Sequence, residues 1–273
     1  MWNAEALDLD AYLTRIGYAG ELRPDLGTLQ EIHRCHTRSI PFENLDVALG
    51  RRISLDVKSL QDKIVRRRRG GYCYEQNSLL AAALERVGFE VAGRGARNRT
   101  RGGALTPVTH AVLVVTVAGR PWLVDAGFGA QGPLEPVPLE PGTEVHQGVW
   151  TYAVAEEDGG RLVLRSLRDE TGWLDLYAFA PQRLHPVDFE VMNHYSSTHP
   201  DSFFTGQVVA MRSAPDHRLA LLEDSVVRFL PGWEAERNRV ASDDVIGLLD
   251  REFGIELPEE DAAQLLRTYW PGV

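Results

Sequence analysis

The sequence predicts an α+β fold on three observations. Segments with the apolar spacing of amphipathic helices fill the first third of the 273-residue chain. Short runs rich in β-branched and aromatic residues follow in the middle third and are separated by turn-forming clusters. The last third contains both kinds of segment. Strands at this spacing are typical of an antiparallel sheet or barrel.

Four helices are predicted in the first third. Residues 8–17, 25–38 and 56–67 carry apolar side chains at intervals of three and four, and Asp25 can cap the second segment. Residues 74–87 are rich in strong helix formers and are followed by a glycine, which commonly ends a helix. The first third is therefore expected to be helical.

The middle third is predicted to begin with a hairpin. Residues 111–117 form a continuous β-branched run, Ala118 and Gly119 follow as a turn, and residues 120–125 form the returning strand. Further strands are expected at 149–155, 161–167 and 173–179. The stretch 131–147 is rich in glycine and proline and is expected to form a long, functional loop.

The last third is predicted to combine strands with two helices. Residues 245–253 follow three residues that can cap a helix, and residues 259–270 follow Pro258 with acidic side chains in the first turn. Strands are expected at 206–212, 217–223 and 225–230.

The composition is that of a globular protein, with 44% hydrophobic residues, 25% charged residues and a net charge of −10. An acidic chain argues against a nucleic-acid partner, because such proteins present basic surfaces. No stretch approaches about 18 apolar residues and the N-terminus lacks a signal-peptide pattern, so no membrane association is expected. Two cysteines cannot form a disulfide framework and suit a reducing, cytoplasmic location.

Cys73 stands directly before the fourth predicted helix. A thiol at a helix N-terminus meets partial positive charge that stabilises a thiolate, and the arginine run 66–69 adds positive potential nearby. Gly70 and Gly71 are expected to let the backbone bend and approach a ligand closely. The sequence leaves open whether Cys73 is a nucleophile or a small buried apolar residue, whereas Cys35, in mid-helix, is interpreted as structural.

A thiolate nucleophile usually works with a histidine that a carboxylate orients, and the hairpin supplies both. If Ala118 and Gly119 form a two-residue turn, Val112 faces Asp125. His110 and Asp125 are then diagonal neighbours on one face, with Cβ atoms about 7–8 Å apart. A three-residue turn would put them on opposite faces. Singly, each also fits a structural role, the histidine at a strand end and the aspartate at a turn.

His33 and His36 lie one helical turn apart near Cys35, which raises the question of a metal site. The chain contains no HExxH or paired CxxC motif, so we interpret both histidines as surface residues and expect no metal. Glycine-rich nucleotide-binding motifs are also missing from the sequence.

Several segments together resemble the arylamine N-acetyltransferase family. Residues 69–77, RGGYCYEQN, are similar to its RGGxCxExN signature, with Cys73 at the nucleophile position. His110 and Asp125 match the family's histidine and aspartate in order and spacing. Two further stretches of the family have counterparts at 39–46 (SIPFENLD) and 193–209 (NHYSSTHPDSFFTGQVV).

The resemblance implies three domains: an N-terminal helical bundle (1–90) that carries Cys73, a central antiparallel β-barrel (91–200) that carries the histidine and the aspartate, and a C-terminal α/β lid (201–273). It implies a Cys-His-Asp core like that of papain-type cysteine proteases and transglutaminases. The implied reaction is ping-pong acyl transfer from acetyl-CoA, through a thioester on Cys73, to an arylamine or arylhydrazine. Acetyl-CoA would be a cosubstrate, with no permanently bound cofactor.

The resemblance also implies residues that support this triad. Those expected to line the arylamine pocket are Phe42, Phe128 and Phe204. Those expected near CoA are Thr109, Gly127 and Gly129. Arg69 and Glu43 are expected to form a buried ion pair that braces the Cys73 loop. The phenylalanines could also be ordinary core residues, and the two charged residues could be exposed.

Two other enzymes and one binding protein fit parts of the pattern. A papain- or transglutaminase-like amidohydrolase would use the same triad. A family member that closes macrocyclic amides in antibiotic biosynthesis would share every catalytic residue. A non-enzymatic binding module would leave Cys73 unreactive. The complete signature favours acetyl transfer to a small-molecule amine, and the sequence indicates no oligomeric state.

Overall fold

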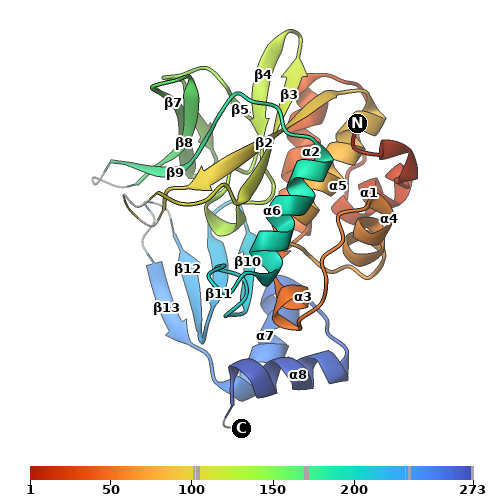
Figure 1. Cartoon of the computed structure of the whole chain (residues 1–273), viewed down its shortest axis with the longest axis vertical. Helices are drawn as coiled ribbons and strands as arrows, with labels where there is room; N and C mark the ends of the chain where they lie inside the picture. The colour runs from red at the N-terminus through yellow and green to blue at the C-terminus, as the bar shows by residue number, and fades with distance from the viewer. Residues whose placement is uncertain (101, 103–104, 169–171, 231, 233–234, 272–273) are drawn as a thin grey trace.

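The computed structural model describes residues 1–271 apart from 101, 103–104, 169–171, 231 and 233–234. Helices occupy the N-terminal part, an eight-stranded antiparallel sheet forms the middle, and a second sheet with two helices forms the C-terminal part (Figure 1). The α+β fold predicted from the sequence is confirmed. Within the described part of the chain, none of the helices is long and apolar enough to cross a membrane.

The N-terminal helices form where the sequence predicts them. Helix α1 spans Leu9–Ile16, α2 spans Leu26–Ser39 and α5 spans Cys73–Val87. Asp25 caps α2, because its carboxylate accepts a hydrogen bond from the Thr28 N–H at 2.9 Å.

The third predicted helix is divided into two kinds of helical turn. Helix α4 (Val57–Leu60) continues directly into a π-helical segment, η2 (Gln61–Arg66). Single π-helical turns inside helices are rare, and many of those that occur lie at functional sites. Two short helical segments complete this part of the fold, η1 (Ala4–Ala6) and α3 (Leu45–Ala48).

The eight-stranded sheet curves into a nearly closed antiparallel barrel with strand order β5-β4-β3-β2-β9-β8-β7-β6. Its strands are β2 (Glu90–Asn98), β3 (His110–Val117), β4 (Arg120–Val124), β5 (Val137–Pro138), β6 (Glu144–Gln147), β7 (Trp150–Glu157), β8 (Arg161–Leu167) and β9 (Trp173–Phe179). The strands predicted in the middle third are confirmed, and β2 is an addition.

The stretch 131–147 is not the long loop predicted from its glycine and proline content. It contains β5 and β6, which pair with β4 and β7 at the two edges of the barrel sheet. A short 3₁₀ turn, η3 (Gly129–Gln131), precedes them. Two-residue and four-residue strands leave too little periodicity for a sequence pattern to reveal.

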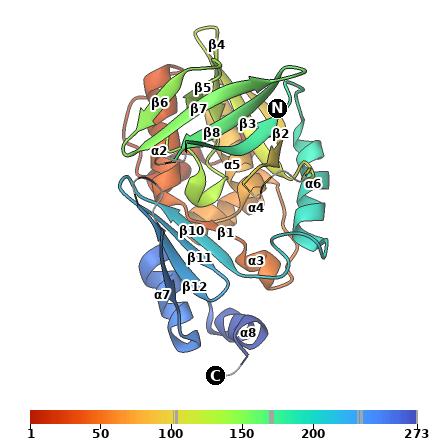
Figure 2. The same ribbon diagram turned by 90° about the vertical axis from the view of Figure 1, so that its left-hand side faces the viewer.

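The second sheet has the order β1-β10-β11-β12-β13, and all of its neighbouring strands are antiparallel. Its strands are β1 (Phe42–Glu43), β10 (Val209–Ser213), β11 (Arg218–Leu222), β12 (Ser225–Phe229) and β13 (Ala235–Arg239). Helix α7 (Val245–Phe253) lies beside this sheet and α8 (Glu259–Tyr269) lies near the C-terminal end (Figure 2). Through β1, the N-terminal part of the chain supplies an edge strand of the C-terminal sheet.

Helix α6 (Pro186–Thr198) was not predicted from the sequence. Its buried side chains are Phe189, Asn193 and Ser196, which share one face at helical spacing. Because two of the three are polar, hydrophobic periodicity does not reveal the helix.

Helix α5 is the central element of the molecule. Its residues from Cys73 to Leu84 are all buried. The helix belongs to a hydrophobic cluster that also contains Ala111, Leu113 and Val115 of β3. Packing of α5 on β3 brings the N-terminus of the helix close to the end of the barrel at which β3 begins.

Candidate active site

Cys73 is the first residue of helix α5, which therefore begins one residue earlier than the sequence predicted. Its side chain is almost fully buried, and its sulfur lies 4.0 Å from the carbonyl oxygen of Thr109. The Glu75 carboxylate caps the helix, because its Oε2 accepts a hydrogen bond from the Tyr72 N–H at 3.1 Å. The first N–H groups of α5 have no partner within the helix, so partial positive charge lies near this sulfur.

Gly70 and Gly71 lie where the folded chain has no room for a side chain, which the sequence alone did not predict. Neither has a positive φ. A Cβ on Gly70 would lie 2.1 Å from the Pro41 carbonyl oxygen, and one on Gly71 would lie 2.8 Å from the Glu75 side chain. The two glycines therefore let the loop before Cys73 pack against the protein itself, and their approach to a ligand stays a prediction.

The hairpin register is the one predicted for a two-residue turn. Val117 pairs with Arg120, and Leu113 pairs with Val124. This register places His110 and Asp125 on the same face, and His110 Nε2 lies 2.8 Å from Asp125 Oδ2. Both side chains are buried, so the ion pair is formed away from solvent.

The charges of this pair support each other. Burial lowers the pKa of His110, but the Asp125 charge and hydrogen bond, together with the Cys73 side chain, raise it to about 10. Burial raises the pKa of Asp125, but His110, Asn77 and the Gly127 N–H lower it below its usual value. A buried imidazolium is therefore stable between the thiol and the carboxylate.

Asn77 is a site residue to which the sequence reading assigned no role. Its Nδ2 donates to Asp125 Oδ1 at 2.9 Å and to the Ala111 carbonyl at 2.7 Å. Its Oδ1 accepts from the Ala126 N–H at 3.1 Å. Asn77 lies one turn beyond Cys73 on α5, so it ties the nucleophile helix to β3 and to the segment that follows β4. The N of the RGGxCxExN signature was the available signal.

His33 and His36 are fully buried, so their interpretation as surface residues is wrong. The Asp125 N–H donates to His33 Nε2 at 3.2 Å, which fixes the backbone that carries the carboxylate. Burial lowers the pKa of His33. Helix α2 therefore contributes a neutral histidine that supports Asp125.

His36 is the second neutral histidine of α2. Its Nδ1 lies 2.8 Å from the Tyr12 hydroxyl and its Nε2 lies 3.2 Å from Gln76 Oε1. Because Gln76 Nε2 donates to the Gly71 carbonyl, Gln76 Oε1 must be an acceptor, so His36 carries its proton on Nε2. Burial, followed by the nearby His33, lowers the pKa of His36 to about 3. Among the described residues, no group of three or more His, Cys, Asp or Glu side chains is arranged to hold a metal ion.

A cavity of about 420 Å³ opens onto Cys73 and His110. The aromatic residues of its wall include Phe42, Phe128 and Phe204, together with Phe203, Phe229 and Tyr195. The His110 ring is flanked by Phe128 and Tyr177, whose ring centroids each lie 5.0 Å away. The reactive groups therefore face a mostly apolar chamber of the size that small-molecule ligands occupy.

Thr109 and Gly127 also line this cavity, as expected for residues near a ligand. Gly127 and Gly129, the two glycines expected near CoA, nevertheless each have a packing role. A Cβ on Gly127 would lie 2.6 Å from the Cys73 Cα, and one on Gly129 would lie 2.5 Å from the Met211 sulfur. Gly129 also has a φ of +80°, which favours glycine. A role of these residues in CoA binding stays a prediction.

Arg69 and Glu43 form the predicted buried ion pair. Arg69 Nη2 and Nε lie 2.9 and 3.1 Å from Glu43 Oε1. Glu43 Oε2 also accepts from the Leu45 N–H at 2.7 Å, so both carboxylate oxygens are used. The Arg69 charge is balanced by this carboxylate, so it adds little of the positive potential that the arginine run was expected to supply.

Comparison with known proteins places this geometry in a family. A family model described as N-acetyltransferase matches residues 25–262. The arylamine N-acetyltransferase of Mycolicibacterium smegmatis is 45% identical over 213 residues, which cover 76% of this chain and 77% of that protein.

Two solved structures show the same similarity in three dimensions. The arylamine N-acetyltransferase from Mycobacterium abscessus matches with a TM-score of 0.96 at 33% identity, covering 100% of this chain and 98% of that chain. The Mycobacterium marinum enzyme, solved in complex with CoA, matches with a TM-score of 0.89 at 34% identity, covering 96% and 99%. These matches define an enzyme of the N-acetyltransferase class. More particularly, the chain belongs to the arylamine N-acetyltransferase family.

Proposed function

We propose that this protein moves an acetyl group from acetyl-CoA, through a thioester on Cys73, to the nitrogen of an arylamine or arylhydrazine. The observation that carries this proposal is the alignment of Cys73, at a helix N-terminus, with the buried His110–Asp125 pair 2.8 Å apart. Membership of the family supports acetyl-CoA as the donor and an arylamine as the acceptor.

The first half of the reaction transfers the acetyl group to the enzyme. The Cys73 thiolate attacks the thioester carbonyl of acetyl-CoA while His110 is protonated. The bond between the acetyl carbon and the CoA sulfur then breaks. The CoA thiolate takes the proton from His110, so CoA leaves as a thiol and the imidazole becomes neutral.

The second half transfers the acetyl group to the amine. The acceptor nitrogen attacks the Cys73 thioester, and neutral His110 takes the proton that the nitrogen loses. The carbon–sulfur bond breaks, and Cys73 leaves as a thiolate beside the imidazolium. Asp125 stabilises that imidazolium and holds the ring with Nε2 toward the carboxylate. The starting charges are thereby restored.

Both half-reactions place negative charge on the carbonyl oxygen. The Cys73 N–H lies in the first turn of α5, where backbone N–H groups have no partner within the helix. One such donor, aimed at a developing oxyanion, is typically worth about 3–4 kcal/mol of the barrier.

The acceptor would enter the cavity lined by Phe42, Phe128 and Phe204. Aromatic walls bury an aryl ring by edge-to-face and stacking contacts and leave its amine to meet the thioester. Phe42 and Phe204 are themselves in contact, with ring centroids 6.0 Å apart. This wall favours aromatic amines and hydrazines over polar aliphatic ones.

Mass spectrometry of the protein and of its proteolytic peptides after mixing with acetyl-CoA tests the proposal. We expect the intact mass to increase by about 42 Da, one acetyl group, and the peptide that contains Cys73 to carry the added group. The added mass should disappear when an arylamine is added. Cys73→Ala should show neither the adduct nor transfer. Hydrolysis of acetyl-CoA without a transient adduct, or turnover by Cys73→Ala, would contradict the covalent route.

A further inference from the structure

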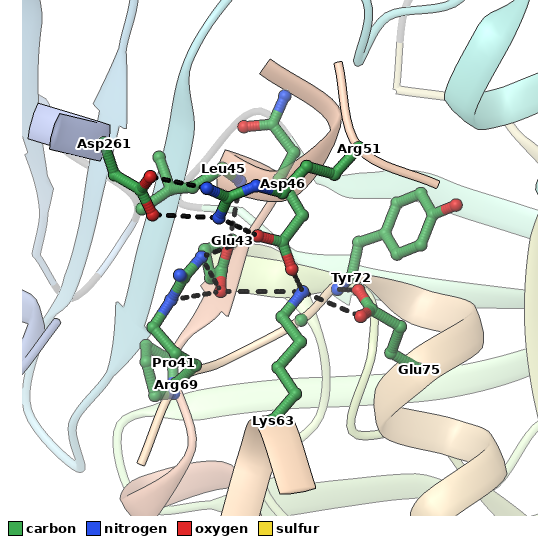
Figure 3. Close-up of polar contacts among 12 residues, drawn as sticks. Pro41, Glu43, Leu45, Asp46, Arg51, Lys63, Arg69, Tyr72, Glu75 and Asp261 are labelled. Atoms are coloured by element: carbon green, nitrogen blue, oxygen red, sulfur yellow. Dashed lines mark hydrogen bonds and ion pairs between the residues drawn. The ribbon is translucent and has the colours of Figure 1, made fainter. Parts of the chain in front are cut away.

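A buried cluster of charges lies beside the start of helix α5 (Figure 3). The carboxylates of Glu43, Asp46 and Glu75 face the ammonium of Lys63 and the guanidinium of Arg69. All five residues are buried, and they come from separate segments of the N-terminal part. Buried charges of this kind are costly to leave unpaired.

Lys63 is the centre of this cluster. Its Nζ lies 2.7 Å from Glu75 Oε1, 2.9 Å from Asp46 Oδ2 and 3.8 Å from Glu43 Oε1. A compact ammonium can meet several carboxylates, whereas a planar guanidinium is suited to bidentate pairing. Lys58 and Lys63 are the only lysines among the 29 Lys and Arg residues of the chain, so lysine at this position is a distinct choice.

Glu75 connects Lys63 to the residue that precedes the nucleophile. One oxygen of Glu75 binds Lys63, and the other accepts the hydrogen bond from the Tyr72 N–H at 3.1 Å. The loop packs tightly on this side chain, since a Cβ on Gly71 would collide with it. The orientation of Glu75 therefore bears directly on the backbone that presents Cys73.

The charge balance of the cluster depends on Lys63. The three carboxylates face two buried cations, and the partly exposed Arg51 lies 3.5 Å from Asp46 at the edge of the cluster. Removal of the ammonium would leave Arg69 as the one buried cation of the cluster. The pKa of Glu75 is raised to about 6 in the folded protein: burial is the main cause, the Lys63 charge opposes the rise and the Glu43 charge adds to it. Burial lowers the pKa of Lys63, but Glu43, Glu75 and Asp46 together raise it above its usual value. Lys63 therefore stays charged, and Glu75 depends on it to stay ionised.

We propose that Lys63 is a positioning residue for acetyl transfer. Its ammonium keeps Glu75 ionised and aimed at the Tyr72 N–H, which fixes the turn that presents Cys73 to His110. The groups facing Glu75 are Lys63 from η2, Glu43 from β1, and Arg69 and Tyr72 from the loop before α5, with Asp46 on the far side of the ammonium. This inference rests on the proposed role of Cys73.

The test compares Lys63→Met with Lys58→Met. Lys58 is exposed and lies five residues earlier, in α4, so it is a matched control for loss of a lysine. For each protein, single-turnover acetylation of Cys73 by acetyl-CoA and its alkylation by iodoacetamide are followed from about pH 5 to 9.

We expect Lys63→Met to react about 10- to 100-fold more slowly than wild type at pH 7, because the nucleophile is misplaced. Its rate should also fall off at a pH about one unit or more higher, since without Lys63 the pKa of Glu75 rises and the carboxylate is lost earlier on acidification. Lys58→Met should match wild type in both respects.

A double variant separates positioning from general damage. In Lys63→Met/Glu75→Gln, the amide oxygen can still accept the Tyr72 hydrogen bond and carries no charge that needs a partner. We expect it to recover about tenfold of the lost rate, with no shifted fall in acid. If Lys63→Met reacts like Lys58→Met, or if the double variant is no faster than Lys63→Met, the inference is overturned.

Three further outcomes are also decisive. If Lys63→Met does not fold, as judged by circular dichroism, the test uses Glu75→Gln instead. A rate that no longer falls on acidification in this variant supports the inference, and a wild-type pH profile overturns it. If wild type itself is not acetylated on Cys73, the proposed function fails. If wild type is acetylated and the variants are indifferent, only the role of Lys63 fails.

Discussion

Two buried histidines of this molecule differ in pKa, although each has 5% or less of its surface exposed. His110, on the barrel, is paired with Asp125, and its pKa is raised to about 10. His36, on α2, has a hydroxyl and an amide as partners, and burial lowers its pKa to about 3. Burial alone therefore favours the neutral imidazole, and only the carboxylate partner keeps a buried histidine charged. The proposed thiolate on Cys73 depends on that difference.

The largest expected effect comes from removing the carboxylate. Asp125→Asn should make His110 resemble His36 and lower the rate of Cys73 acetylation by about 10⁴-fold, because the imidazolium loses its partner. Single-turnover mass spectrometry with acetyl-CoA measures this rate. Asp175→Asn, which removes a half-exposed pair with Arg165 on the barrel, is the matched control and should leave the rate unchanged. A near-wild-type rate in Asp125→Asn would show that the carboxylate is not what distinguishes His110 from His36.

A smaller effect is expected from the residue that holds the carboxylate. Asn77→Ala removes bonds to Asp125, Ala111 and Ala126 and should lower the acetylation rate about 10- to 100-fold. The free energy of unfolding should fall by about 1–3 kcal/mol, because buried backbone groups lose their partners. Urea unfolding and single-turnover kinetics measure the two effects. Asn238→Ala, on an exposed position of β13, should change neither.

The stability of the fold should depend on pH in opposite senses at the two histidines. The folded-state pKa of His36 lies below the unfolded value of about 6.5, so its contribution to the unfolding free energy is lost as pH falls from about 6.5 toward 3, by about 1.4 kcal/mol per pH unit. The folded-state pKa of His110 is raised, so its contribution is complete below about 6.5 and is lost as pH rises toward about 10.

Urea unfolding at a series of pH values, on wild type, His36→Gln and His110→Gln, measures these contributions as differences. His36→Gln should lack the acid-side loss and His110→Gln should lack the alkaline-side loss. The same pH dependence in both variants would show that the two histidines carry the same charge.

The smallest effect is expected where a neutral histidine is replaced. His36→Gln should leave the pH profile of Cys73 acetylation unchanged between about pH 6 and 8, because His36 does not titrate in that range. A shift of the profile in this variant would mean that His36 shares the charge assigned here to His110.

The sequence predicted the parts of the site that depend on short-range order. A two-residue turn sets the register of β3 and β4, so the pairing of His110 with Asp125 followed from the positions of Ala118 and Gly119. The start of a helix rich in strong helix formers could likewise be predicted from composition, to within one residue of its observed start at Cys73.

The parts that could not be predicted depend on contacts between distant segments. His33 lies 92 residues from the Asp125 backbone that it supports, and no local pattern marks it as buried. Glu75 and Lys63 are charged residues in helical segments, which the polar pattern of a sequence assigns to the surface. The Gly70–Gly71 pair was noticed, but its reason, the close approach of Pro41 and Glu75, exists only in the folded chain.

The central claim, that Asp125 keeps His110 charged while other buried histidines are neutral, is tested most directly by nitrogen NMR of the histidine rings. Comparison with His110→Gln and His36→Gln assigns the signals among the eight histidines of the chain. At pH 8 we expect both ring nitrogens of His110 to have imidazolium shifts, and His36 to show one protonated and one unprotonated nitrogen. A neutral His110 at pH 8 would contradict the account.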